Sequence, residues 1–271
     1  MNCKVMGIVN VTPDSFSDGG QFFKPEEAIR RAKNLIAEGA DIIDLGGEST
    51  RPGATPISWE EEWSRLEPVL AGLQAIEQSN NPNNRTILSV DTYHPETAAR
   101  AIAAGANIIN CVYPEPVAEM VKLLEGNDVE LVVPCRKSGE AESFPLQNKD
   151  GFPFLTSGKD SASPFLSRLY LDPMIGFGTT REEDIELLRS IPELAKKGRV
   201  LVGASRKRIV KKLVGDPTSP RLRRTGNSVG KNIGGNVAIA VWAAMQGASV
   251  VRVHDVKETV QALLVVEKLR G

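Results

Sequence analysis

The chain has 271 residues, of which 41% are hydrophobic and 25% charged, and its formal net charge is -1. This balance is typical of a globular protein and gives no reason to expect nucleic acid or an acidic membrane surface as a partner. Three cysteines in a chain of this length argue against a disulfide framework and favour a reducing, cytoplasmic location. No apolar run in the sequence is long enough to span a bilayer.

The first half of the chain alternates short apolar runs with amphipathic segments. The run from Val5 to Val9 predicts a buried strand that opens at Asn10 into a polar loop rich in turn-forming residues. Helical spacing, capping residues and glycines place the elements that follow. In chain order we expect a strand at 5–9, a helix at 25–38, a strand at 41–45, a helix at 58–76, a strand at 87–91, a helix at 95–104, a strand at 108–110, a helix at 117–124 and a strand at 129–133.

The second half resumes this alternation after an irregular segment at 137–167, which predicts a long loop. We then expect a strand at 169–172, a helix at 180–194, a strand at 200–203, a basic irregular segment at 215–233, a helix at 235–245, a strand at 250–254 and a helix at 256–269. Eight strands that alternate with helices predict an α/β chain folded as one closed (β/α)8 TIM barrel over residues 1–271. An open doubly wound sheet is the alternative.

Polar side chains stand at or just past the carboxyl end of every predicted strand. They are Asn10, Thr50, Arg51, Asp91, Asn110, Arg136, Asp172, Ser205, Lys207, Arg252 and His254. Any one of them has an ordinary explanation as a helix cap or a solvated charge. In a barrel, however, these ends meet on the face where barrel enzymes keep their active sites, so the set as a whole favours a functional site.

The chemistry of these residues divides into two groups. Asp91, Asn110, Asp172 and Lys207 offer carboxylates, an amide and a cation that suit the amino-pyrimidinone edge of a planar heterocycle. A second group of cationic and hydroxyl donors suits phosphate or diphosphate, and it consists of Thr50, Arg51, Arg252 and His254. Asn10 has a neutral oxygen that could hold Mg2+ together with diphosphate oxygens.

Seven segments resemble, in order, the motifs of the dihydropteroate synthase family. They are MGIVNVTPDSFSDGG, DLGGESTRPGA, SVDTY, GANIIN, LDPMIGFG, LVGASRK and GASVVRVHDVKETV. The first, second and last are long and specific, and the match covers nearly the whole chain except residues 111–168 and 215–233. The resemblance implies a (β/α)8 barrel of folate synthesis that joins 4-aminobenzoate to 7,8-dihydropterin-6-ylmethyl diphosphate and is a target of sulfonamides.

The resemblance also implies a role for individual residues. Asp91, Asn110, Asp172 and Lys207 would bind the pterin, with Phe177 beside it. Asn10 would contact Mg2+, while Arg51, Arg252 and His254 would contact the diphosphate. Thr50, Arg51 and Pro52 would belong to a loop over 4-aminobenzoate, whose pocket Ser205 would line. Asp91, Lys207, Arg252 and His254 would act in catalysis, in which diphosphate departs before the amine attacks.

The sequence departs from the family pattern at Cys111, at Pro134 to Arg136 and at Met174, and we expect these changes to lie around the pterin end of the pocket. They keep open two alternatives: a divergent, weakly active or inactive pterin-binding paralogue, and a pterin-dependent methyl-transfer domain. The intact Ser-Thr-Arg-Pro and Ser-Arg-Lys segments favour the synthase. By analogy with the family we also expect a homodimer, for which Trp242 is a candidate anchor.

Overall fold

The computed structural model describes residues 2–12, 24–49, 54–79, 86–135, 166–214 and 232–271. The described residues include eight parallel strands that pair in chain order, and the last also pairs with the first, so that the sheet closes into a barrel. The strands are β1 (Lys4–Asn10), β2 (Ile42–Gly46), β3 (Ile87–Asp91), β4 (Ile108–Asn110), β5 (Glu130–Pro134), β6 (Leu169–Asp172), β7 (Arg199–Val202) and β8 (Val250–Val253). The expected TIM barrel is therefore confirmed.

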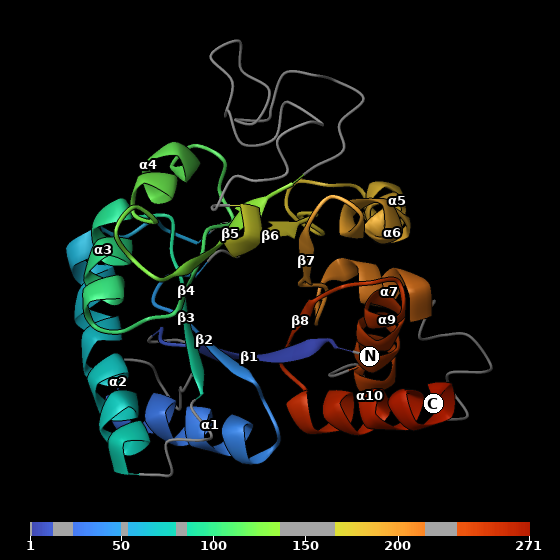
Figure 1. Cartoon of the computed structure of the whole chain (residues 1–271), viewed down its shortest axis with the longest axis horizontal. Coiled ribbons are helices and arrows are strands. Elements are labelled where there is room, and N and C mark those ends of the chain that lie inside the picture. Colours follow the sequence, from blue (N-terminus) through green and yellow to red (C-terminus); the bar gives the residue numbers. More distant parts are fainter. Residues whose placement is uncertain (1, 13–23, 50–53, 80–85, 136–165, 215–231) are drawn as a thin grey trace.

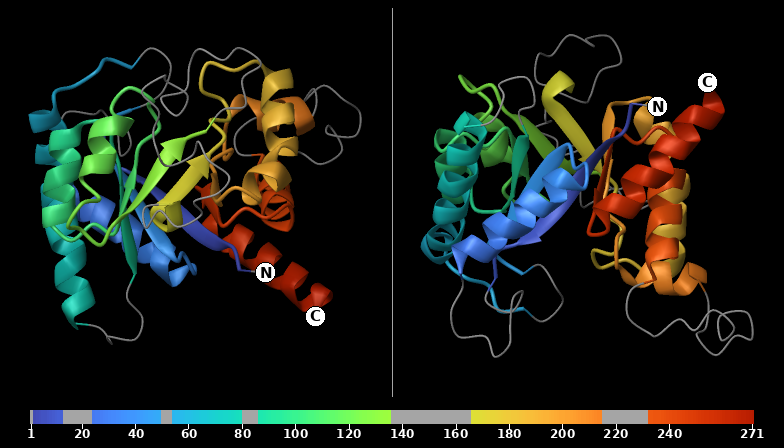
Figure 2. Two further views of the ribbon diagram at one scale, coloured as in Figure 1. Left: turned by 45° about the horizontal axis from the view of Figure 1, so that its top comes forward. Right: turned by 90° about the horizontal axis from the view of Figure 1, so that it is seen from below.

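Helices surround this barrel, as Figures 1 and 2 show from three directions. They are α1 (Pro25–Ala37), α2 (Trp59–Ser79), α3 (Pro95–Ala103), α4 (Val117–Lys122), the short 3-10 turn η2 (Leu166–Arg168), α5 (Arg181–Arg189), α6 (Ile191–Ala195), α7 (Arg208–Val214), α9 (Ile233–Met245) and α10 (Val256–Arg270). None of the helices in the described ranges is both long and apolar enough to cross a membrane.

Two helical regions differ from the sequence expectation. The single helix expected at 180–194 is two helices, α5 and α6, that meet at Ser190. Pro192 lies in the first turn of α6, where its missing N–H is readily tolerated, so the helix restarts at that point. Pro68, by contrast, lies inside α2 without ending it. The pattern after Lys207 did not predict α7, a short helix that buries Ile209 and Val210. Most of the two irregular segments lies outside the described residues.

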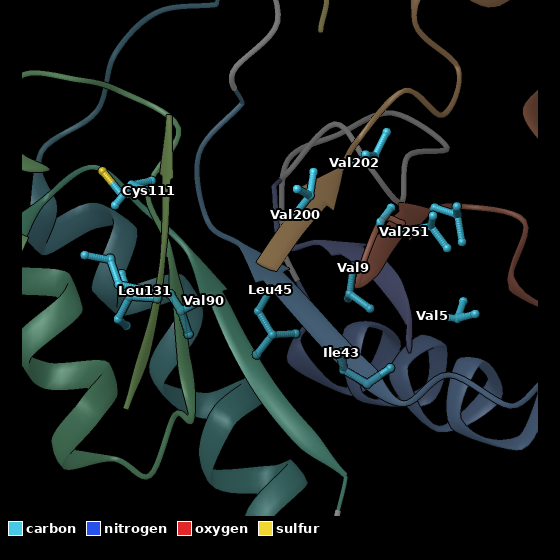
Figure 3. Packing of buried hydrophobic residues seen from close by; sticks show 14 of the residues in the cluster. Val5, Val9, Ile43, Leu45, Val90, Cys111, Leu131, Val200, Val202 and Val251 are labelled. Carbon is cyan, nitrogen blue, oxygen red and sulfur yellow. The ribbon is translucent and has the colours of Figure 1, made fainter. Parts of the chain in front are cut away.

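The barrel separates two apolar layers. The inner layer fills the barrel with one buried side chain from each strand except β3. These side chains are Met6, Ile42, Ile108, Val132, Tyr170, Leu201 and Val250. The larger layer fills the space between the strands and the surrounding helices, and Figure 3 shows part of it around Ile43, Leu45 and Val251. Successive residues of a strand point to opposite faces, so the two layers take alternate positions of the same strand.

Strand register brings the carboxyl ends of the strands to one face of the barrel. Gly46 of β2 lies between Asn10 of β1 and Asp91 of β3, and Asp91 in turn pairs with Asn110 of β4. On the next strands, Asp172 of β6 pairs with Pro134 of β5. Polar residues that are far apart in the sequence therefore become neighbours at this C-terminal face.

Candidate functional site

Period-two alternation aims the polar strand-end residues into the barrel. Asn10 shares the inward face of β1 with Met6, and Asn110 and Asp172 share theirs with Ile108 and Tyr170. Asn110 and Asp172 are buried, and of the residues described none donates a hydrogen bond to Oδ1 of Asn110. A buried acceptor of this kind is available to a ligand donor.

Arg252 of β8 lies at the centre of the site, between two carboxylates. Its Nε donates to Oδ2 of Asp44 and its Nη2 donates to Oδ2 of Asp91, both at 2.6 Å. Asp44 is fully buried on β2 and accepts further hydrogen bonds from Ser89 at 2.6 Å and from Asn110 at 3.3 Å. Arg252 was expected to contact diphosphate and Asp91 to bind the heterocycle. Their hydrogen bond therefore connects the two sets of residues.

Lys207 completes the site from the loop after β7. Its Nζ donates to the carbonyl oxygen of Ile175 at 2.6 Å and lies 4.2 Å from the ring centroid of Phe177. Asp172 faces the same region and accepts a hydrogen bond from the backbone N–H of Met174 at 2.8 Å. The loop after β6 therefore orients both a carboxylate and a cation for a planar ligand.

Ser205 and His254 meet where the loops after β7 and β8 adjoin. Nδ1 of His254 lies 3.1 Å from the Ser205 hydroxyl, which also accepts a hydrogen bond from the His254 backbone N–H at 3.3 Å. Burial and the nearby guanidinium of Arg206 lower the pKa of His254 to about 3. The imidazole is therefore neutral near pH 7, and it can offer a neutral N–H to an anion through Nε2.

Burial displaces the pKa values of the ionisable groups in the site. It raises the pKa of Asp91 to about 7, against the opposing effect of Arg252. It also raises the pKa of Asp172, and it lowers the pKa of Lys207 to about 8. Three carboxylates, Asp44 among them, thus share the interior with two cations. Perturbed groups of this kind are concentrated at functional sites in proteins.

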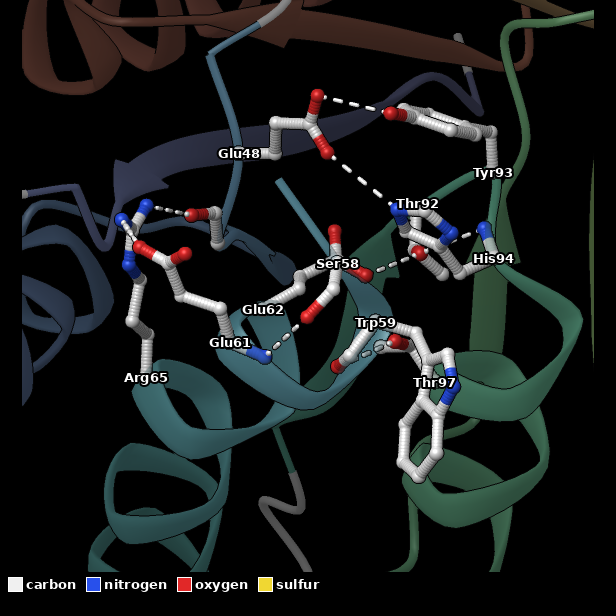
Figure 4. Close-up of polar contacts among 11 residues, drawn as sticks. Glu48, Ser58, Trp59, Glu61, Glu62, Arg65, Thr92, Tyr93, His94 and Thr97 are labelled. Carbon is white, nitrogen blue, oxygen red and sulfur yellow. Dashed lines mark hydrogen bonds and ion pairs between the residues drawn. The ribbon is translucent and has the colours of Figure 1, made fainter. Parts of the chain in front are cut away.

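A second polar cluster borders the site where β2 and β3 end, and Figure 4 shows it. Glu48 accepts a hydrogen bond from the Tyr93 hydroxyl at 2.8 Å and lies 3.4 Å from Nε2 of His94. Beneath it, the buried Glu62 of α2 accepts a hydrogen bond from Thr92 at 2.6 Å. These contacts fasten the exit of β2 to the exit of β3.

The structure brings together most of the residues that the sequence analysis selected. Asp91, Asn110, Asp172, Lys207 and Arg252 converge on the C-terminal face, and Phe177, Ser205 and His254 border them. Asn10 ends β1 on the same face. Thr50, Arg51, Pro52 and Arg136 lie outside the described residues.

Sequence reasoning missed Asp44, which accepts a hydrogen bond from Arg252, and Ser89, which donates to Asp44. Both lie two residues before the last residue of their strand, and therefore on the same face as the strand end. A carboxylate inside an otherwise apolar strand was the signal that could have revealed Asp44.

One expected location is wrong. Cys111 does not line the pocket but is fully buried in the outer layer between strands and helices, where Figure 3 labels it. Its neighbour Asn110 takes the inward position, so alternation sends Cys111 outward. Met174 does lie at the site, with a positive φ of 64°, and is buried.

Known proteins share both the sequence and the fold of this chain. The family model "pterin binding enzyme" matches residues 6–254. The dihydropteroate synthase of Staphylococcus haemolyticus is 36% identical over 260 residues, which cover 93% of this chain and 90% of the relative. A folate synthesis bifunctional protein of Arabidopsis thaliana is 33% identical, and the match spans 95% of this chain and 55% of that protein.

Solved structures agree with the sequence matches. The dihydropteroate synthase of Xanthomonas albilineans with 4-aminobenzoic acid is 35% identical, with a TM-score of 0.74, and the match covers 100% of this chain and 94% of that one. The enzyme of Anaplasma phagocytophilum with bound 6-hydroxymethylpterin-monophosphate is 30% identical, with a TM-score of 0.73 and coverage of 99% and 100%. Together with the cluster around Arg252, these matches show that the chain belongs to the pterin-binding enzymes and, within them, to the dihydropteroate synthases.

Proposed function

We propose that this chain condenses 7,8-dihydropterin-6-ylmethyl diphosphate with 4-aminobenzoate, giving 7,8-dihydropteroate and diphosphate in folate biosynthesis. The observation that carries the proposal is the set of Asp91, Asn110, Asp172 and Lys207 around Arg252 at one end of the barrel, of which Asn110 and Asp172 are buried. Two carboxylates, a cation and an amide oxygen that has no donor among the described residues complement the alternating donors and acceptors of a pterin edge. Ligands of related chemistry appear in the named structures of the relatives.

In the proposed reaction the carbon–oxygen bond to diphosphate breaks first and leaves a cationic methylene conjugated with the pterin ring. The amine nitrogen then forms the new carbon–nitrogen bond and releases a proton. The carboxylates of Asp91 and Asp172 favour the developing cation because they face it in a buried, preorganised site. No protein nucleophile is required, so the Ser205–His254 pair serves binding, with His254 toward the departing diphosphate and Ser205 toward 4-aminobenzoate.

We further propose that Mg2+ assists this reaction. In the described residues no three His, Cys, Asp or Glu side chains are grouped to hold a metal ion. Asn10 at the end of β1 nevertheless fits Mg2+, which commonly takes one or two protein oxygens and completes its shell with substrate phosphates and water. When bound, the ion would supply positive charge to the leaving diphosphate. Arg252, together with Thr50, Arg51 and Pro52 outside the described residues, would complete the binding of the two substrates.

The test is a turnover assay with both substrates and Mg2+, paired with calorimetric titration of the pterin diphosphate. We expect binding followed by formation of dihydropteroate and diphosphate. Binding without product would contradict the proposal and would favour the divergent paralogue. Methyl transfer from a methylated pterin without use of 4-aminobenzoate would favour the methyl-transfer domain.

We also propose that the chain forms a homodimer in the cytoplasm. The outer faces of α9 and α10 expose apolar side chains, among them Trp242 at 37% and Leu269 at 82%. Cys3, Cys111 and Cys135 are free thiols, in keeping with a reducing compartment. Light scattering should give twice the mass of one chain, and Trp242→Glu should shift it toward the monomer. A monomer at all concentrations would contradict the dimer.

A further inference from the structure

Three side chains fasten the exit of β7 to the exit of β8. The Arg206 backbone N–H donates to Oδ1 of Asn236 at 2.9 Å, and Nδ2 of Asn236 donates to Oδ2 of Asp255 at 2.9 Å. Nη2 of Arg206 closes the ring by donating to Oδ1 of Asp255 at 2.6 Å. Asn236 and Asp255 are buried, at 4% and 8% exposure. We call Arg206, Asn236 and Asp255 the loop clamp.

The loop clamp holds a strained residue between two residues of the site. Arg206 has a positive φ of 60°, which is unfavourable for a non-glycine residue and persists only where the surroundings enforce it. Ser205 and Lys207 flank it, so the backbone turn at Arg206 sets where both side chains point. On the other strand exit, Asp255 directly follows His254. The clamp therefore spans the 3.1 Å contact between Ser205 and His254.

We propose that Asn236 and Asp255 are positioning residues, which hold Lys207 and Ser205 in register with His254 for the two substrates. This proposal rests on the synthase function proposed above. Neither residue lies among those assigned to the substrates, and Asn236 comes from α9, on the outer side of the barrel. Their effect on the reaction would pass through the loop that they hold and not through contact with the reacting atoms.

The donors and acceptors of the loop clamp allow a sharp test. With Asp255→Asn, two amides face each other beside two Arg206 donors, and any flip of either amide leaves one donor against another. With Asn236→Asp, two carboxylates face each other. The reciprocal exchange Asn236→Asp with Asp255→Asn restores every pairing, because residue 236 then accepts from the Arg206 N–H and from residue 255. Residue 255 in turn still accepts from the Arg206 guanidinium.

The experiment compares the full chain, both single variants and the exchange. A small displacement of groups that bind the substrates costs a large part of the rate, so kcat/KM for the pterin diphosphate should fall about tenfold to a hundredfold in each single variant. The exchange should recover it to within about threefold of the unmodified chain. Tyr170→Phe is the control, since it removes the partly buried hydrogen bonds of the Tyr170 hydroxyl with Glu130 and Arg199 at the opposite end of the barrel and should leave kcat/KM unchanged.

A second measurement does not depend on activity. The chain has two histidines, so 15N spectra of the ring nitrogens report His254 directly once His94→Gln has assigned the other signals. We expect the His254 signals to move in both single variants and to return in the exchange. Single variants that lose thermal stability but keep kcat/KM and the His254 signals would overturn the proposal, because the clamp would then be merely structural.

Failure of the exchange to recover folding, activity or the His254 signals would overturn it as well, since all three hydrogen bonds are restored there. If the single variants do not fold while the exchange folds and turns over, the loop clamp is required for folding and the proposal of a positioning role is overturned. If the unmodified chain gives no product, the synthase function fails. The 15N comparison then still decides whether the loop clamp sets the geometry of His254.

Discussion

The two ends of the barrel each carry a carboxylate, a guanidinium and a hydroxyl, yet they are built differently. At the N-terminal end, Arg199 pairs with Glu130, which accepts a hydrogen bond from Tyr170 at 3.0 Å, and the guanidinium stacks 4.0 Å over the Tyr170 ring. One acid there meets one base. At the C-terminal end, Asp44, Asp91 and Asp172 face Arg252 and Lys207 in a buried space.

The comparison separates a structural ion pair from a site prepared for a ligand. The N-terminal pair remains about one-third exposed, so water shares the solvation of its charges. The C-terminal set is largely buried and contains three carboxylates but two cations. Burial holds the pKa of Asp91 near 7 and that of Lys207 near 8. Buried groups that lack full compensation are costly to the free protein, and a ligand with complementary donors relieves that cost.

Lys207→Met should have the largest effect on activity. It removes the cation that lies over Phe177 and bonds to Ile175, and kcat/KM for the pterin diphosphate should fall about a thousandfold. The melting temperature should stay level or rise, because a buried cation is replaced by an apolar chain. Lys212→Met on α7 is the control, since Lys212 forms a half-exposed pair with Glu182 at 3.0 Å. Equal kinetics for the two variants would refute the contrast.

Asp44→Asn should lower kcat/KM about tenfold to a hundredfold, since Arg252 loses the charge of one of its two carboxylate partners. Steady-state kinetics and thermal unfolding should show this loss together with reduced stability. The same change just before β2, Asp41→Asn, weakens the 2.7 Å hydrogen bond from the Val5 N–H. Its kcat/KM should stay unchanged, and a matching loss there would contradict the assignment of Asp44.

The pH profile of kcat/KM should be bell-shaped. We expect kcat/KM to fall severalfold from its maximum as the pH drops below about 7 and again as it rises above about 8. Ionised Asp91 is needed on the acid side, and charged Lys207 on the alkaline side. Lys207→Arg should remove the alkaline limb while Asp91 keeps the acid limb. An alkaline limb that persists in this variant would belong to another group.

The free energy of unfolding of the ligand-free chain should fall with rising pH over the range in which kcat/KM increases. The folded pKa of Asp91 lies above its ordinary value of 3.8, so the unfolded chain binds fewer protons between about pH 4 and 7. This group's contribution is therefore present below pH 4 and is lost as the pH rises through 7. Chemical unfolding of the unmodified chain and of Asp91→Asn, measured at several pH values, should show the difference between them growing over that window.

Tyr170→Phe should have the smallest effect on activity and is the test of the N-terminal end. Loss of the hydroxyl, which donates to Glu130 at 3.0 Å and accepts from Arg199 at 3.1 Å, should lower the free energy of unfolding by about 1 kcal/mol. Denaturant titration should detect this loss, while kcat and KM for both substrates should remain unchanged. A kinetic effect would show that the two ends are coupled through the barrel interior.

The sequence predicted the barrel and most of the site because both depend on local pattern. Alternating strands and helices imply parallel crossovers, and closure brings the strand ends together without further information. Asp91, Asn110 and Asp172 are recognisable because each is the last residue of its strand. Lys207 follows directly from the resemblance.

Other features depend on pairings that a single chain does not reveal. That Arg252 would lie against Asp44 and Asp91 requires the register of β8, β2 and β3 at once, and their sequence separations are large. The break between α5 and α6 was available in Pro192 but competed with a continuous helical pattern. The outward position of Cys111 follows from alternation, once Asn110 is known to face inward.

Asp172 is oriented by a main-chain group, whereas Arg252 is oriented by a side chain. This difference affects which amino-acid substitutions the chain tolerates. The Met174 main chain supplies the donor to Asp172, and every amino acid except proline carries that N–H group. Codon changes at position 174 therefore preserve the contact, and glycine would even relax the positive φ. Arg252 depends on the side chain of Asp44, which almost any missense change would remove. Evolutionary variation should accordingly be wider at 174, among residues that tolerate a positive φ and burial, than at 44.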